Sequence, residues 1–307
     1  MTSAANVESG APPEWFTRAL ATKPLAQATV VAGASIAYRT WGEPGGRGIV
    51  LVHGGAAHSR WWDHIGPLLA AGRRVVALDL SGHGDSDRRE SYTLDLWARE
   101  VLAVAADAGI TAPPVVVGHS MGGFVTLRAA ALFGAAMEGA VVIDSPVRVI
   151  TPEEAAAREK RAFGELRVYP TREAIIAHFR PVPDQPVLGY VADHVAATSI
   201  RRVAGGWTWK FDPRIFGRDR PRDLLTRLDC RVALLQAEHG IVTPEMMEVM
   251  YDRLGRVAPV IELPVAGHHV MLDQPVALVA VIRTLLSDWD HSLPAAPREP
   301  DALFNRH

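Results

Sequence analysis

The segment "VVVGHSMGGF" at residues 115–124 places a serine between glycines directly after a run of valines. Three consecutive β-branched residues favour a buried strand, and "MGGFVTLRAAALFG" after the serine has the composition of a helix. Residues 118–122 fit the pattern G-x-S-x-G, in which a sharp strand-to-helix turn lifts the serine hydroxyl above the edge of a sheet. We therefore interpret Ser120 as a candidate nucleophile, with an ordinary glycine-rich turn as the alternative.

The composition is that of an ordinary globular protein with ample material for a core. The 307 residues are 48% hydrophobic and 21% charged, with a formal net charge of −2, so no basic surface for nucleic acid or an acidic membrane is expected. The single Cys230 excludes an intramolecular disulfide. The first residues resemble no secretory signal, and no apolar run reaches the length of a membrane span. We expect a cytoplasmic protein.

Strand-like and helix-like segments alternate on both sides of the serine. Near-continuous Val, Ile and Leu in "IVLVHGG", "RVVALDL", "PPVVVGHS" and "MEGAVVID" predict an α/β fold with a mostly parallel central sheet flanked by helices. The alternation stops near residue 147 and resumes at "CRVALLQAEHG". The expected organisation is an N-terminal extension at 1–27, a core at 28–146 and 228–290, a mainly helical cap at 147–227, and a C-terminal tail at 291–307.

A serine hydroxyl is a weak nucleophile at neutral pH and needs an adjacent base. "VAGHHVMLDQP" places His268 and His269 just before the last helical segment. The segments "VHGG", "DLSGHGDSD", "GHSMGG" and "AGHHVMLDQP", in this order, resemble the α/β-hydrolase superfamily over about residues 28–290, in particular its serine esterases and lactonases with a helical cap. The resemblance implies that His268, directly after the glycine, is the base and that His269 is a packing or pocket neighbour.

The resemblance also implies an oxyanion hole. Acyl transfer needs two preorganised N–H donors for the oxygen that becomes negative. The residue after the nucleophile, Met121, is expected to supply one donor. The second is implied to come from the loop after "HG", at Gly55, with Ala56 as the alternative.

The carboxylate that orients the histidine departs from the usual pattern. Most members of the family place an aspartate in a stretch like G-x-x-D-x-x-x-P after the seventh strand. Here residues 237–244 read "AEHGIVTP", and Gly240 occupies the aspartate position. Asp144, at the end of "VVID", matches a minority of the family with the acid after the sixth strand. We expect Asp144 to be the acid, with Glu238 as the alternative, because Glu238 sits two residues early.

The resulting hypothesis is a serine hydrolase that forms an acyl-enzyme with a small, largely apolar carboxylic ester or lactone. We expect no cofactor and no metal, since the sequence has no H-x-x-x-H pair and no Cys/His cluster. C–C bond hydrolysis, cofactor-free perhydrolysis and a ligand receptor with negligible turnover stay open as alternatives. Candidate walls of an apolar pocket, with core packing as the alternative for each, are His58, Trp61, Trp62, Trp207 and Trp209.

Overall fold

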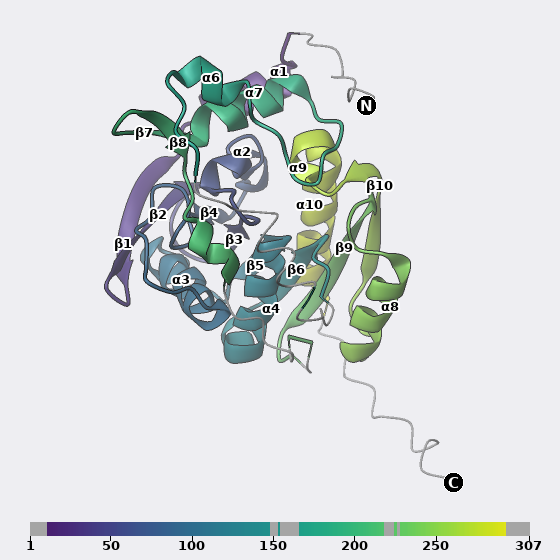
Figure 1. Ribbon diagram of the computed structural model, residues 1–307. Helices are drawn as coiled ribbons and strands as arrows, with labels where there is room; N and C mark the ends of the chain where they lie inside the picture. Colours follow the sequence, from purple (N-terminus) through teal and green to yellow (C-terminus); the bar gives the residue numbers. More distant parts are fainter. Residues whose placement is uncertain (1–10, 148–152, 154–165, 218–223, 226–227, 293–307) are drawn as a thin grey trace.

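A single eight-stranded sheet organises the computed structural model, which describes residues 11–147, 153, 166–217, 224–225 and 228–292. Its strands are β1 (Leu25–Val31), β2 (Ala34–Trp41), β3 (Gly48–Val52), β4 (Arg74–Leu78), β5 (Val115–His119), β6 (Gly139–Ile143), β9 (Arg231–His239) and β10 (Val260–Gly267). Their order is β1-β2-β4-β3-β5-β6-β9-β10 (Figure 1). Only β1 with β2, and β2 with β4, pair antiparallel; all the other neighbours are parallel. The predicted mostly parallel sheet is confirmed.

Helices cover both faces of the sheet, which explains the unbroken apolar runs in the central strands. Ile49 and Leu51 of β3 belong to a core cluster on one face, whereas Val50 and Val52 pack into a cluster on the other face. Every residue of β3, β4, β5 and β6 is buried. The first face is covered by α1 (Glu14–Ala21), α2 (Gly66–Leu69), α9 (Val270–Asp273) and α10 (Pro275–His291), and the second by α3 (Leu94–Asp107), α4 (Met121–Phe133) and α8 (Pro244–Arg253).

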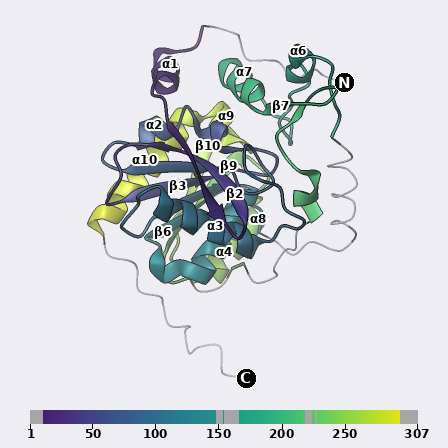
Figure 2. The same cartoon turned by 90° about the vertical axis from the view of Figure 1, so that its left-hand side faces the viewer.

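The described elements between β6 and β9 form a separate group at one end of the sheet, where α7 lies close to α1 (Figures 1 and 2). The described elements are α6 (Arg172–Ile176), α7 (Gly189–Thr198), β7 (Ile200–Val203), β8 (Gly206–Trp209) and the 3-10 helix η3 (Pro213–Gly217). We call this segment the insertion. The expected boundary at 227 lies outside the described residues.

The insertion is less helical than the sequence predicts. We expect "DHVAATSIRRVAGG" to be one helix, but α7 ends at Thr198 and β7 pairs antiparallel with β8. Gly205 and Gly206 both adopt positive φ and make the reversal between these strands. The β-branched residues Ile200 and Val203 suit a pleated strand, so this part of the prediction is wrong.

Polar and aromatic contacts attach the insertion to the core beyond the ends of the strands. Lys210 Nζ lies 2.6 Å from Asp85 Oδ1, and His194 Nε2 lies 3.1 Å from Asp63 Oδ2. The ring of Tyr190 on α7 lies 4.8 Å from that of Phe16 on α1. The helix α1 of the N-terminal extension therefore packs against the insertion as well as the core.

Two remaining 3-10 helices, η1 (Ser59–Trp62) and η2 (Gly134–Ala136), lie in connections between strands and helices.

Within the described residues, none of the helices combines the length and the apolarity that crossing a bilayer requires.

Candidate active site

Ser120 lies at the turn between β5 and α4, in a backbone conformation that few non-glycine residues adopt. Its φ is 53° and its ψ is −115°. The turn is held by a hydrogen bond from Ser120 N to Ile143 O at 2.9 Å. Helix α4 also approaches β3 so closely that a β-carbon added to Gly122 would lie 2.4 Å from Val52 O. Tight packing of this helix on the sheet thus requires glycine at position 122, two residues after the serine.

His268, at the end of β10, connects Ser120 to Asp144. Its Nε2 lies 3.1 Å from Ser120 Oγ, and its Nδ1 lies 2.7 Å from Asp144 Oδ2. A carboxylate only accepts hydrogen bonds, so the proton of the neutral ring sits on Nδ1 and the lone pair of Nε2 faces the serine. The three residues come from distant parts of the sequence, and the arrangement allows the ring to remove the proton of the hydroxyl.

Asp144 occupies the space that a side chain at position 240 would need. A β-carbon added to Gly240 would lie 2.3 Å from Asp144 Oδ1. Asp144 Oδ2 also accepts a hydrogen bond from Ile241 N at 2.9 Å, and the residue is fully buried. The other candidate, Glu238, is exposed and instead accepts a hydrogen bond from Val265 N at 2.6 Å. The structure therefore brings Asp144, and not Glu238, to the histidine.

The loop after β3 lies beside the serine. A β-carbon on Gly54 would be 3.4 Å from Ser120 Cβ, and one on Gly55 would be 3.8 Å from Met121 Sδ. Met121 is the first residue of α4, where backbone N–H groups have no partner within the helix. His53 holds the loop, because its Nδ1 lies 2.7 Å from Gly54 O. Gly55 and Met121 are thus neighbours at the serine.

A network that the sequence analysis missed holds the backbone on both sides of His268. His269 N donates to Gln185 Oε1 at 2.7 Å, and Gly267 N donates to Asp273 Oδ2 at 2.6 Å. Gln185 Nε2 also donates to Asp273 Oδ2, at 3.0 Å. An amide of the insertion and a carboxylate of α9 thereby position the histidine loop together. Gln185 stands in an irregular loop with no motif, so no sequence signal marks it.

Two of the predicted pocket residues are engaged elsewhere. Trp62 is 0% exposed, so no water-sized space touches it, and its assignment to a pocket wall is corrected to core packing. His58 Nε2 lies 2.8 Å from Ser199 Oγ, while its Nδ1 accepts a hydrogen bond from Arg60 N at 3.3 Å. Nε2 of His58 therefore joins the core to the insertion, while Nδ1 caps η1 within the core. Burial lowers the pKa of His58 well below the usual value.

The other three tryptophans pack in two different places. Trp61 lies 5.5 Å from the ring of His269 and 6.2 Å from that of Phe179, which in turn lies 6.1 Å from Trp209. These residues form an apolar group beside the histidine loop. Trp207 instead pairs with Tyr169 and packs within the insertion. Burial, together with the nearby His268, lowers the pKa of His269 to about 3, so this ring is neutral.

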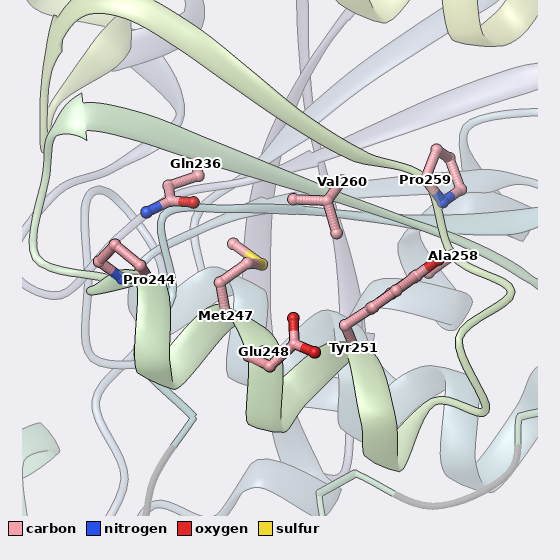
Figure 3. A pocket seen from close by; sticks show the side chains of 8 residues that line it. All are labelled: Gln236, Pro244, Met247, Glu248, Tyr251, Ala258, Pro259 and Val260. Carbon is pink, nitrogen blue, oxygen red and sulfur yellow. The ribbon is translucent and has the colours of Figure 1, made fainter.

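A separate hollow lies between α8 and the strands β9 and β10 (Figure 3). It contains none of the residues around Ser120. Its lining is Gln236, Pro244, Met247, Glu248, Tyr251, Ala258, Pro259 and Val260. These side chains include no nucleophile paired with a base, and we do not assign the hollow to catalysis.

Comparison with known proteins gives the same family as the geometry. The alpha/beta hydrolase family matches residues 49–281. The chain belongs to the α/β-hydrolase family. It is 27% identical over 273 residues to the esterase Rv0045c of Mycobacterium tuberculosis, covering 86% of this chain and 90% of that protein.

Two further relatives cover most of the chain. The lipase LipV of the same organism is 26% identical over 259 residues, which are 80% of this chain and 95% of the lipase. The crystal structure of a hypothetical protein from Pseudomonas aeruginosa PAO1 is similar at a TM-score of 0.71 and 27% identity, covering 87% of this chain and 99% of that one.

Gly240→Ala tests the close approach of Asp144 to β9. We expect the added methyl group to displace the carboxylate and to lower the free energy of unfolding by about 1–3 kcal/mol. The measurement is denaturant unfolding of Gly240→Ala alone and in an Asp144→Ala background. The second background removes the carboxylate, so Gly240→Ala should cost less there. An equal cost in both backgrounds would contradict the contact.

Asp273→Asn tests the half-buried carboxylate that bonds to the histidine loop. Burial raises the pKa of Asp273 from 3.8 to about 6. The folded protein therefore holds this proton more tightly than the unfolded chain does. The resulting stability is fully present below the unfolded pKa near 3.8 and is lost as the pH rises through about 6. Asparagine keeps an acceptor oxygen and cannot ionise.

We therefore expect the melting temperature of Asp273→Asn to rise relative to that of the wild type between pH 4 and pH 7. Thermal unfolding followed by circular dichroism across this range measures it. Parallel curves for the two proteins would show that Asp273 titrates equally in the folded and unfolded states.

Proposed function

We propose that this protein is a serine hydrolase that cleaves carboxylic esters through an acyl-enzyme. The hydrogen-bonded series from Ser120 Oγ through His268 to Asp144 carries the proposal, because it provides a nucleophile, a base and a carboxylate that orients the base. The esterase and lipase among the relatives support ester bonds as the substrate class.

The proposed reaction uses these groups in turn. Ser120 Oγ attacks the carbonyl carbon while its proton moves to His268 Nε2, and Asp144 stabilises the imidazolium that forms. The carbonyl oxygen becomes negative and accepts hydrogen bonds from the backbone N–H groups of Gly55 and Met121. When the tetrahedral intermediate collapses, the alcohol leaves with the proton from His268. Water, activated by His268, then attacks the acyl-enzyme, and the acid is released with Ser120 restored.

The apolar group of Trp61, Phe179 and Trp209 beside the histidine loop supports a substrate with an apolar acyl or ring portion. An open-chain ester and a lactone both present a carbonyl that fits this chemistry. For a lactone the alcohol stays attached to the acyl group, so a single hydroxy acid is released.

Asp144→Asn and Glu238→Gln form a matched pair that identifies the acid. We expect Asp144→Asn to lower kcat by about 10⁴-fold, since an amide at this position disturbs the tautomer of His268. Glu238→Gln should leave kcat within about twofold, because surface substitutions change little. Steady-state hydrolysis of p-nitrophenyl esters gives both values. The reverse ranking would move the role of the acid to Glu238.

Ser120→Ala tests turnover itself. The wild type should release many equivalents of p-nitrophenol per chain from short p-nitrophenyl esters, and Ser120→Ala should fall to the level of the oxyanion hole and binding alone. A parallel series of lactones and of C–C bonded diketones compares the bond types. One equivalent of product per chain without further turnover would indicate a ligand receptor. Equal rates for the variant and the wild type on every substrate would refute the serine mechanism.

A further inference from the structure

Three histidines from two strand ends meet around the catalytic base. His119 ends β5, and His268 and His269 follow each other after β10. Each histidine has one ring nitrogen that belongs to a set of three nitrogens, and these three lie within 4.8 Å of one another. The ring of His268 lies 4.7 Å from each of the other rings, and His119 lies 5.4 Å from His269. All three side chains are buried.

The hydrogen bonds of each ring determine which of its two nitrogens carries the lone pair. His119 Nε2 lies 2.8 Å from the carbonyl oxygen of His268, and His269 Nε2 lies 3.1 Å from that of Val182. A carbonyl only accepts, so both rings carry their proton on Nε2 and their lone pair on Nδ1. In His268 the Asp144 carboxylate holds the proton on Nδ1, which leaves the lone pair on Nε2.

Two of these lone pairs have no donor. Nδ1 of His119 and Nδ1 of His269 are buried atoms without a hydrogen-bond partner. A buried polar atom without a partner costs stability, and a set of such atoms at one place is a signal for a ligand that supplies the missing interaction. A lone pair is satisfied by a hydrogen-bond donor or by a metal ion, and nitrogens of three imidazoles this close together favour the metal ion.

We propose that His119, His268 and His269 form a binding site for a divalent transition-metal ion such as Zn²⁺, and that its occupation inhibits the enzyme. Neutral imidazole is a preferred ligand of these ions. Zn–N bonds of 2.0–2.1 Å place the nitrogens of a tetrahedral site about 3.3 Å apart. From separations of at most 4.8 Å, each nitrogen needs to move by less than about 1 Å. The fourth position is left for water or for Ser120 Oγ.

Inhibition follows from the lone pair that the metal takes. His268 Nε2 must accept the proton of Ser120 during attack, and coordination to the metal occupies that lone pair. No covalent bond is made or broken, so removal of the metal by a chelator restores the base. The binding itself stands on the three rings alone, while the inhibition rests on the proposed function.

The binding is tested first, in a protein that needs no activity. Calorimetric titration of ZnCl₂ into full-length Ser120→Ala should give one site. Adding His269→Phe, or separately His119→Gln, should weaken this site at least about tenfold, the scale seen when groups around a metal are lost. Adding His291→Ala, which removes an exposed histidine on α10, should leave it unchanged. Equal affinity in all four proteins, or no binding in any, would overturn the site.

The inhibition is tested by the ZnCl₂ concentration that halves ester hydrolysis, with each variant compared to its own metal-free rate. This concentration should rise at least about tenfold in His269→Phe and in His119→Gln relative to the wild type and His291→Ala, and EDTA should restore the rate. Tight binding without any loss of rate would overturn the inhibitory role while leaving hydrolysis established. A wild type without hydrolysis would refute the proposed function, and the calorimetric result would still decide the metal site.

Discussion

The hydrogen bond between His268 Nδ1 and Asp144 Oδ2, at 2.7 Å, is the constraint around which the site is arranged. It joins the end of β10 to the end of β6 although β9 lies between these strands in the sheet. The connection is possible because β9 is followed by Gly240, where any side chain would collide with the carboxylate. The same bond fixes the proton of the ring and turns the lone pair of Nε2 toward Ser120.

Strained backbone at the site is supported by a rigid sheet. Ser120 and Asp144 have φ values of 53° and 42°, in the left-handed region that costs most non-glycine residues about 1–3 kcal/mol. Each follows a strand that is buried along its whole length, and Ser120 N bonds to Ile143 O in the neighbouring strand. The strands hold their neighbours on both sides, so the two turns cannot relax independently. Packing of the core thereby fixes the positions of Ser120 and of the Asp144 carboxylate.

The insertion contributes to the site by hydrogen bonding as well as by apolar side chains. Gln185 bonds to the backbone next to His268 and to Asp273 beneath it, so the histidine loop and the insertion are one connected unit. The cluster of three imidazoles depends on that loop, because His269 is also tied to Val182 of the insertion. The positions of His268, the proposed base, and of the proposed metal site therefore arise from the same contacts.

The sequence by itself determined the sheet, the serine turn and the histidine at the end of the last strand. These features are encoded locally, in unbroken apolar runs and in glycines that a sharp turn requires. Only the tertiary structure decided that Asp144 rather than Glu238 reaches His268. It also decided that Trp62 belongs to the core and that His58 contacts Ser199. Finally, it decided that Gln185 and His119 bond to the histidine loop. It likewise decided the β7–β8 hairpin, where glycines and strand pairing outweighed a helical pattern. Contacts between residues more than 80 positions apart depend on how strand ends and loops converge, and no local pattern of residues records that convergence.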